Sequence, residues 1–298
     1  MIQPEYLQKG DTVAIVSTAR KITSDKIIRA IKLLEKWGLQ VIIGETIGSE
    51  ENQFSGSDEK RIADFQQQLD NPKVKAIWCA RGGYGTVRLI DKLDFSAFKK
   101  HPKWIVGYSD ITVLHSHIHN FGIETLHATM PINLENNSQQ VLETFQKSLF
   151  GKSLSYEILA DKKNRSGNAS GELVGGNLSV LYSLLGSNSA IKTDGKILFI
   201  EDLDEYLYHI DRMCINLKRN GYFENLKGLV VGGMTDMHDN EIPFGKTAEE
   251  IILDCVSEYD FPVIFNFPAG HLDDNRALIL GRKVTLDVGE IKSKITFL

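Results

Sequence analysis

Short apolar runs alternate with amphipathic segments over the first part of the chain. The apolar runs are rich in β-branched residues and are predicted to be strands: residues 12–16, 41–43, 76–79 and 104–106. The segments between and after them carry apolar residues at helical spacing and are predicted to be helices: residues 24–37, 57–70 and about 111–119. Strands that alternate with helices indicate parallel βαβ units in which helices cover both faces of a sheet.

The pattern changes between about residues 134 and 170. A polar helix is followed by a single strand from Leu154 to Leu159, and then by a charged run, rich in serine and asparagine, from Asp161 to Ser170. That composition is typical of a linker or an exposed excursion. Further strands are predicted at residues 197–200, 229–231, 263–265, 284–286 and 295–297, and further helices at 178–185 and 207–219.

These elements predict an α/β protein of two domains. We expect an N-terminal α/β domain with a mostly parallel sheet (residues 1–135), a linker or excursion (136–170) and a C-terminal α/β domain with substantial β-structure (171–298). A chain of 298 residues is long for one compact core, which supports this division. Open α/β sheets bind ligands at the carboxyl ends of their strands, so the functional residues are expected there.

Composition and charge argue against some classes of partner. Hydrophobic residues make up 42% of the chain and charged residues 24%, which are ordinary values, and a net charge of −5 gives no sign of a nucleic-acid-binding surface. The longest apolar runs are strand-sized, so no membrane-spanning segment is predicted. The first residues show no secretory signal, and Cys79, Cys214 and Cys255 are few and widely separated. We therefore expect buried free thiols and a cytoplasmic location.

Ser109 is the first candidate for a chemical role. It lies in Gly107-Tyr108-Ser109-Asp110, between an apolar strand and a predicted helix. Such a turn exposes a hydroxyl and directs the free N–H groups of the new helix toward it, so Ser109 is a candidate nucleophile and the N–H of Asp110 a candidate oxyanion donor. Ile111 stands where G-x-S-x-G has its second glycine, and the alternative is that Ser109 or Asp110 only caps the helix.

A glycine-rich segment, Arg81-Gly82-Gly83-Tyr84-Gly85, follows another predicted strand. Its glycines permit positive φ and close approach of the backbone to a ligand. It has neither the G-x-G-x-x-G of a dinucleotide site nor the lysine and hydroxyl residue of a P-loop, so a nucleotide site is only weakly indicated. The segment is either a tight turn or a loop that supplies a second oxyanion N–H.

Glu201 follows the predicted strand 197–200 and begins an acidic run that ends at Glu205. Acidic residues are favoured at the start of a helix, which accounts for Asp204 and Glu205, and such a run can also bind a divalent metal. Helix charge explains less well an acid at the end of an apolar strand. Glu201 is therefore a candidate catalytic acid.

His271 follows the Pro-Ala-Gly of residues 268–270, just beyond the predicted strand 263–265. A histidine on such a loop suits proton transfer, because its ordinary pKa is about 6.5. His115, His117 and His119 also alternate along the chain, but only the first and third share a helix face and no H-E-x-x-H motif accompanies them. A structural or surface role is expected for them rather than a metal site.

Ser109, Glu201 and His271 each lie at or just beyond the carboxyl end of a predicted strand, where an α/β protein forms its binding site. Together they supply the nucleophile, the acid and the base that acyl transfer requires. The order Ser, Glu, His is one of several that give this geometry. The sequence therefore predicts a serine hydrolase, provided that the three side chains meet.

Several motifs resemble those of the LD-carboxypeptidase family of serine peptidases. They are GDTVA at residues 10–14, RGGYG at 81–85, GYSD at 107–110, GELVGGNL at 171–178, FIED at 199–202 and PAGH at 268–271. The resemblance runs from about residue 10 to residue 288, in the family's order. One departure is that Ser17-Thr18-Ala19 follows the first strand, where the family usually has a Pro-Ser pair.

The resemblance implies a hydrolase in which Ser109 is the nucleophile, His271 the general base and Glu201 the acid that orients the base. It implies backbone oxyanion donors, which are Asp110 and either Gly82 or Gly83. It further implies that no metal or cofactor takes part and that the protein is a homodimer. The family's main members release the terminal D-alanine from the L-centre of diaminopimelate or lysine in murein tetrapeptides during cell-wall recycling, so a small peptide is the expected substrate.

Three alternatives to a murein peptidase are compatible with the sequence. A branch of the same family gives immunity to microcin C by cleaving an amide in a peptidyl-nucleotide, but the interval between Ser109 and His271 is short for that branch. The other two are a non-catalytic α/β module that binds a small ligand at its glycine loops and a metal-dependent hydrolase. A substrate with a free carboxylate calls for a nearby cation, and Arg81 and Arg276 lie beside the motif loops, although either can equally be a surface or structural residue.

Overall fold

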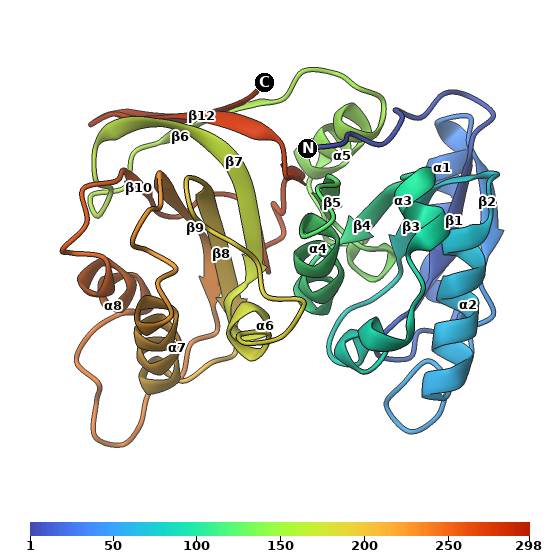
Figure 1. Cartoon of the computed structure of the whole chain (residues 1–298), viewed down its shortest axis with the longest axis horizontal. Helices are drawn as coiled ribbons and strands as arrows, with labels where there is room; N and C mark the ends of the chain where they lie inside the picture. Colours follow the sequence, from blue (N-terminus) through green and yellow to red (C-terminus); the bar gives the residue numbers. More distant parts are fainter.

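The computed structural model describes all 298 residues, which form two β-sheets that lie side by side, each with its own helices (Figure 1). The N-terminal half of the chain forms most of one lobe and the C-terminal half forms the other. Helix α4 (Thr112–His119) lies where the two lobes meet and faces strand β7 (Gly167–Asn177) of the second lobe. The predicted α/β fold class is confirmed.

The first sheet is mostly parallel, as predicted. Its strands are, in spatial order, β11 (Leu278–Leu280), β5 (Thr125–His127), β4 (Trp104–Gly107), β3 (Val74–Cys79), β1 (Thr12–Val16) and β2 (Gln40–Ile43). Strands β1 to β5 are parallel to their neighbours, and only β11 is antiparallel, beside β5. The carboxyl ends of β1, β3 and β4 therefore meet at one edge of this sheet.

Helices cover both faces of the first sheet. They are α1 (Ile28–Lys36), α2 (Asp58–Asp70), α3 (Ser96–Lys100), α4 and α5 (Gln139–Leu149). Successive residues of a strand point to opposite faces, so Val13 and Ile15 of β1 pack with α1 and α5. Ala14 and Val16 pack on the other face, in the core that includes residues of α2, α3 and α4.

The second sheet combines parallel and antiparallel strands. In spatial order they are β10 (Val263–Ile264), β9 (Gly228–Thr235), β8 (Ile197–Leu203), β7, β12 (Lys283–Val288), β13 (Lys292–Phe297) and β6 (Ser155–Leu159). Strands β7 to β10 are parallel, whereas β7, β12, β13 and β6 are joined by antiparallel ladders. Helices α6 (Leu178–Ser183), α7 (Leu207–Arg219) and α8 (Ala248–Cys255) contribute to one apolar core against β8 and β9.

Two segments differ from the sequence-based expectation. Within the segment 136–170, expected to be a linker or excursion, the polar helix and the single strand lie where the sequence indicated them, as α5 and β6, but the charged run 161–170 includes the start of β7. The Gly167–Asn177 strand was missed because its first half is polar and glycine-rich: it pairs there with β12 and has one face exposed. Strand β11 lies within residues 171–298 but completes the first sheet, so the two sheets do not divide at one point of the chain.

The structure also bears on the cysteines and on the question of a membrane-spanning segment. Cys79, Cys214 and Cys255 are buried and form no disulfide, in agreement with the prediction of buried free thiols. Measured against the length and hydropathy that a bilayer requires, no helix qualifies as a membrane span.

Helix α4 and strand β7 approach each other very closely. A Cβ atom on Gly176 would lie 2.5 Å from Oγ1 of Thr112, in the first turn of α4. The same Oγ1 accepts a hydrogen bond from the N–H of Asn177 at 3.0 Å. Because α4 follows directly on Ser109 and β7 pairs with β8, this contact sets the separation between Ser109 and the strand that carries Glu201.

A buried ion pair also ties the C-terminal part of the chain to the first sheet. Arg282, in the turn after β11, donates to both carboxylate oxygens of Glu124 at 2.7 and 2.5 Å and to the hydroxyl of Tyr6 at 3.1 Å. Glu124 is only 4% exposed, so loss of the arginine would leave a buried carboxylate without its partner.

We expect Arg282→Met to lower the free energy of unfolding by about 3–5 kcal/mol, the usual cost of breaking a buried pair from one side. The double variant Arg282→Met/Glu124→Leu is expected to lose much less, because it leaves no charge unpaired. Urea unfolding followed by circular dichroism measures both values. Equal losses in the single and double variants would show that the unpaired carboxylate is not the cause.

Candidate active site

A pocket of about 560 Å³ lies between the two lobes, at the carboxyl ends of the strands of both sheets. One wall comes from the first sheet and includes Gly82, Gly83, Ser109 and Asp110, and the other includes residues that follow β7 and β8. His271 also lines the pocket. All the predicted site residues except Glu201 therefore line one cavity, and Glu201 lies behind His271, fully buried.

Ser109 lies in a strained turn between β4 and α4. Its φ is +63°, in the left-handed region that residues other than glycine rarely adopt. The preceding Gly107 has φ +155°, and a Cβ there would lie 2.8 Å from the Ile111 side chain, which packs over it. Neither Ser109 nor Asp110 caps a helix with its side chain, so the capping alternative is not observed.

The side chain of Asp110 connects this turn to the glycine-rich loop. It is buried, and its Oδ2 accepts a hydrogen bond from the N–H of Thr86 at 2.9 Å. Burial raises the pKa of Asp110, which the hydrogen bonds from Thr86 oppose in part. The residue that follows Ser109 is thus attached to the end of the loop that the sequence identified as a second source of oxyanion donors.

The two adjacent glycines of that loop have different neighbours. A Cβ on Gly82 would lie 3.1 Å from Cβ and 3.2 Å from Oγ of Ser109, and 3.4 Å from the backbone N of Asp110. A Cβ on Gly83 would instead lie 2.6 Å from Cδ of Arg20. Gly82 is therefore the glycine that adjoins Ser109, and its missing side chain leaves space beside the hydroxyl and the Asp110 N–H.

Arg61, which sequence reasoning missed, holds the loops after β1 and β3 together. Its side chain is fully buried and donates from Nη1 to the carbonyls of Thr18 at 2.6 Å and Gly85 at 3.3 Å. It also pairs with Asp58. In the sequence it is one charged residue on an amphipathic helix, and no local pattern distinguishes it from an exposed one.

Glu201 and His271 are in direct contact. Oε2 of Glu201 accepts hydrogen bonds from Nδ1 of His271 at 2.6 Å and from its backbone N–H at 3.2 Å. Gly270 makes this approach feasible, because a Cβ there would lie 2.6 Å from the same oxygen. With Nδ1 donating to the carboxylate, Nε2 of a neutral His271 is left as the proton acceptor.

The electrostatics of this pair favour the charged form of the histidine. Burial alone would lower the pKa of His271, but the negative charge of Glu201 and its hydrogen bond outweigh burial and raise it. Burial would conversely raise the pKa of Glu201, but His271 holds it below its ordinary value. The carboxylate therefore stays ionised and can stabilise an imidazolium.

Further residues that the sequence did not single out fix the position of His271. The ring of Tyr108 lies 4.9 Å from the imidazole. Oδ1 of Asn275 accepts a hydrogen bond from the N–H of Gly270 at 2.8 Å and lies 3.2 Å from Nε2 of His127. Because an amide oxygen can only accept, Nε2 is the nitrogen of the His127 ring that carries the proton. Burial lowers the pKa of His127 to about 4, so this ring is neutral at pH 7.

Ser109 and His271 share the pocket, but no hydrogen bond joins them. The structure brings Glu201 and His271 into contact and places Ser109 on the facing wall. Contacts of this kind are often long in an enzyme without substrate and tighten when substrate binds.

The acidic run after Glu201 is largely occupied by partners. Asp202 accepts hydrogen bonds from Nδ2 of Asn177 and the N–H of Ser179, both at 2.8 Å, and burial raises its pKa to about 7. Asp204 pairs with His238 and Glu205 with His209. No three His, Cys, Asp or Glu side chains in the structure are grouped so that they could hold a metal ion.

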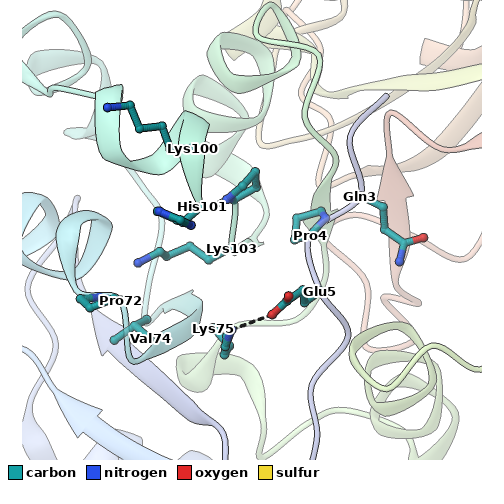
Figure 2. A pocket seen from close by; sticks show the side chains of 10 residues that line it. Gln3, Pro4, Glu5, Pro72, Val74, Lys75, Lys100, His101 and Lys103 are labelled. Atoms are coloured by element: carbon teal, nitrogen blue, oxygen red, sulfur yellow. Dashed lines mark hydrogen bonds and ion pairs between the residues drawn. The ribbon is translucent and has the colours of Figure 1, made fainter.

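Other basic side chains lie outside this pocket. Arg276, one of two arginines that the sequence suggested near the substrate, pairs with Asp274 and donates to Gln140. Figure 2 shows a smaller pocket of about 250 Å³ at the amino ends of β3 and β4, where Lys75, Lys100, His101 and Lys103 gather. Lys103 donates to two backbone carbonyls and Lys75 pairs with Glu5, so both have structural partners.

We expect His271 to titrate above pH 6.5, about the ordinary midpoint of histidine, in nuclear magnetic resonance spectra of the side chains. Glu201→Gln removes the negative charge and leaves burial as the main influence, so the midpoint is expected to fall below that of the wild type. Glu205→Gln, which changes a carboxylate that pairs with His209, is the control and should leave His271 unchanged. The same midpoint in wild type and Glu201→Gln would refute this explanation.

Comparison with known proteins identifies the family. Residues 13–128 match the model of the LD-carboxypeptidase N-terminal domain, and residues 170–286 match that of the LD-carboxypeptidase C-terminal domain. The chain is 37% identical to a probable murein peptide carboxypeptidase of Bacillus subtilis, over 97% of this chain and 92% of that protein. It is 25% identical to the microcin C7 self-immunity protein MccF of Escherichia coli, over 97% and 94% of the two chains.

The solved structures give the same result. The crystal structure of muramoyltetrapeptide carboxypeptidase from Oxalobacter formigenes superimposes with a TM-score of 0.88 at 27% identity, and the match covers 96% of this chain and 98% of that one. Both lobes are thus shared with that protein. The chain belongs to the LD-carboxypeptidase family.

Proposed function

We propose that the protein is a serine carboxypeptidase that hydrolyses the L,D amide bond of murein tetrapeptides and releases their terminal D-alanine. The observation that carries the proposal is the Glu201–His271 hydrogen bond at the pocket whose facing wall presents Ser109. The names of the similar proteins support the substrate class, because the Bacillus subtilis protein is described as a probable murein peptide carboxypeptidase and the Oxalobacter formigenes protein as a muramoyltetrapeptide carboxypeptidase.

In the first step, Oγ of Ser109 attacks the carbonyl carbon at the L-centre of the diamino acid, and its proton passes to Nε2 of His271. The buried Glu201 carboxylate stabilises the imidazolium that forms. The proton then moves from His271 to the amine of D-alanine as the amide C–N bond breaks. The tripeptide remains as an ester on Ser109.

The negative charge on the former carbonyl oxygen is stabilised by backbone N–H groups. The N–H of Asp110 lies in the first turn of the helical segment that begins at Ser109, where N–H groups have no partner within the helix, and it adjoins Gly82 on the pocket wall. The glycine loop supplies the second donor beside Gly82. In the second step, water gives a proton to His271 and its oxygen attacks the ester carbonyl. The bond between this carbon and Oγ of Ser109 then breaks, His271 returns the proton to Oγ, and the tripeptide leaves as its acid.

The microcin C branch offers a second candidate function, cleavage of an amide in a peptidyl-nucleotide. Its support is the full-length similarity to the MccF protein, at lower identity than to the Bacillus subtilis protein. Both reactions would use the same three residues, so substrate assays rather than substitutions in the triad distinguish them.

We also infer that the enzyme acts in the cytoplasm and, as the family resemblance implies, without a metal or cofactor and as a homodimer. Three unpaired buried cysteines fit a reducing compartment. Light scattering coupled to size-exclusion chromatography tests the homodimer. A measured mass of 33.4 kDa, that of one chain, would mean a monomer.

The proposed function predicts that wild-type protein releases D-alanine from L-Ala-γ-D-Glu-meso-diaminopimelyl-D-Ala in the presence of EDTA. Ser109→Ala should lose about 10⁶-fold in kcat, as expected for removal of a nucleophile that works as one unit with its base. Ser257→Ala, on the exposed surface, is the matched control and should keep full activity. Near wild-type turnover by Ser109→Ala, or loss of activity with EDTA, would contradict the proposal.

Gly82→Ala tests the oxyanion site separately. Its backbone φ is compatible with alanine, but the new methyl group would lie 3.2 Å from Oγ of Ser109 and close to the Asp110 N–H. We expect a loss of about 10²–10³ in kcat, comparable to removal of one oxyanion donor, with little change in thermal stability. The control is Gly289→Ala in a distant turn, also at a compatible φ. Unchanged kcat in Gly82→Ala would place the oxyanion elsewhere.

A further inference from the structure

Two arginines lie on the wall of the pocket that belongs to the first sheet. Arg20 follows β1 and Arg81 follows β3, and these strands are parallel neighbours, so both side chains reach the same edge of the sheet. Only Arg81 was noted from the sequence. Arg20 follows Ser17-Thr18-Ala19, where this chain departs from the family pattern, and it belongs to none of the motifs.

Neither arginine has an acidic partner, in contrast to nearby cations. Lys21, the next residue, pairs with Glu50 at 2.9 Å, and Arg88 pairs with Asp58 at 2.7 Å. Arg81 donates one hydrogen bond, to the carbonyl of Lys21, and the guanidinium of Arg20 donates none. Their positive charge at this wall is therefore not neutralised by the protein.

The two guanidinium groups are close enough to repel each other. Arg81 is half-buried, and burial lowers its pKa, while the charge of Arg20 lowers it further. Two like charges that are held together without a counter-ion favour the binding of an anion, because the anion relieves both the repulsion and the loss of solvation.

The glycine loop places Arg20 next to the reacting atoms. Gly82 adjoins Ser109, and the side chain of Arg20 runs across Gly83, whose Cβ would lie 2.9 Å from Nε of Arg20. Neighbouring Cα atoms are about 3.8 Å apart. The Arg20 side chain is therefore displaced from the Ser109 hydroxyl by about the distance between two neighbouring residues, Gly82 and Gly83.

The facing wall carries acidic side chains. Asp204 and Glu205 line it, beside Asp202, whose pKa burial raises to about 7, so a carboxylate on the substrate is favoured at the arginines rather than there. The unpaired cations of the pocket wall are thus Arg20 and Arg81, on the same side as Ser109 and Gly82.

We propose that Arg20, together with Arg81, binds the free carboxylate of the substrate's C-terminal residue and thereby restricts the enzyme to removal of the last residue. The inference rests on the proposed function. In a peptide, the carboxylate carbon of the last residue is separated from the scissile carbonyl carbon only by the amide nitrogen and Cα, which matches the one-residue offset between Gly82 and Gly83. A guanidinium binds a carboxylate through two parallel hydrogen bonds, whereas an internal peptide bond offers no charge at this position.

The test compares the murein tetrapeptide with its C-terminal amide, which lacks only the charge. We expect the wild type to cleave the acid with a kcat/KM roughly 10- to 100-fold higher than the amide, in line with the strength of hydrogen bonds to charged groups. Arg20→Gln should lose most of this preference, because its kcat/KM for the acid falls while that for the amide changes little. Arg20→Lys should retain part of the preference. Lys21→Gln removes the same charge from the adjacent residue, which does not line the pocket, and should keep the full preference.

A binding measurement separates this inference from the proposed function. In a Ser109→Ala background, calorimetry gives the Kd of the acid and of the amide, with and without Arg20→Gln. Tighter binding of the acid that depends on Arg20 supports the inference even if the wild type fails to cleave the tetrapeptide, in which case only the proposed function fails. Three outcomes overturn the inference. They are cleavage or binding without a preference for the acid, an equal loss on the acid and the amide in Arg20→Gln, and no binding of either peptide.

Discussion

The close contact between α4 and β7 is the constraint on which the candidate site depends, because its three residues come from two separate sheets. Gly176 lies against Thr112 with no room for a side chain, and the hydroxyl of Thr112 accepts a hydrogen bond from the backbone N–H of Asn177. On one side of this contact, α4 begins directly after the Ser109 turn. On the other side, β7 pairs with β8 up to Glu201. A larger residue at position 176 would move the two walls of the pocket apart.

Several glycines of this site are required because a side chain at their positions would prevent a close contact. Gly175 passes over the carbonyl of Phe199, Gly270 lets the His271 loop touch Glu201, and Gly82 leaves space beside Ser109. In each case a methyl group would meet backbone or a functional group rather than a flexible side chain end. These close approaches explain the glycines at positions 82, 175 and 270.

Much of the first sheet and the placement of the site residues at strand ends could be predicted from the sequence. Strand β1 and helix α7 were predicted with the bounds that the structure has, because β1 is a short run of apolar and β-branched residues and α7 has apolar residues at helical spacing. Strand β7 could not be predicted, since its polar, glycine-rich first half reads as a loop and becomes a strand only through pairing with β12, far away in the sequence. Arg20 and Arg61 were missed for a related reason: the role of a charged residue depends on which distant groups surround it, and no local pattern records them. The proximity of Glu201 and His271 was an expectation from the family resemblance, which the geometry now supplies with a distance.

The central claim is that Ser109 forms a covalent ester with the tripeptide during turnover. It is tested most directly by turnover of the murein tetrapeptide in the presence of hydroxylamine, with mass spectrometry of the products. The account predicts that part of the tripeptide appears as its hydroxamate, in a proportion that rises with hydroxylamine while the release of D-alanine continues. Tripeptide acid as the only product at every hydroxylamine concentration would contradict an ester intermediate and point to direct attack by water.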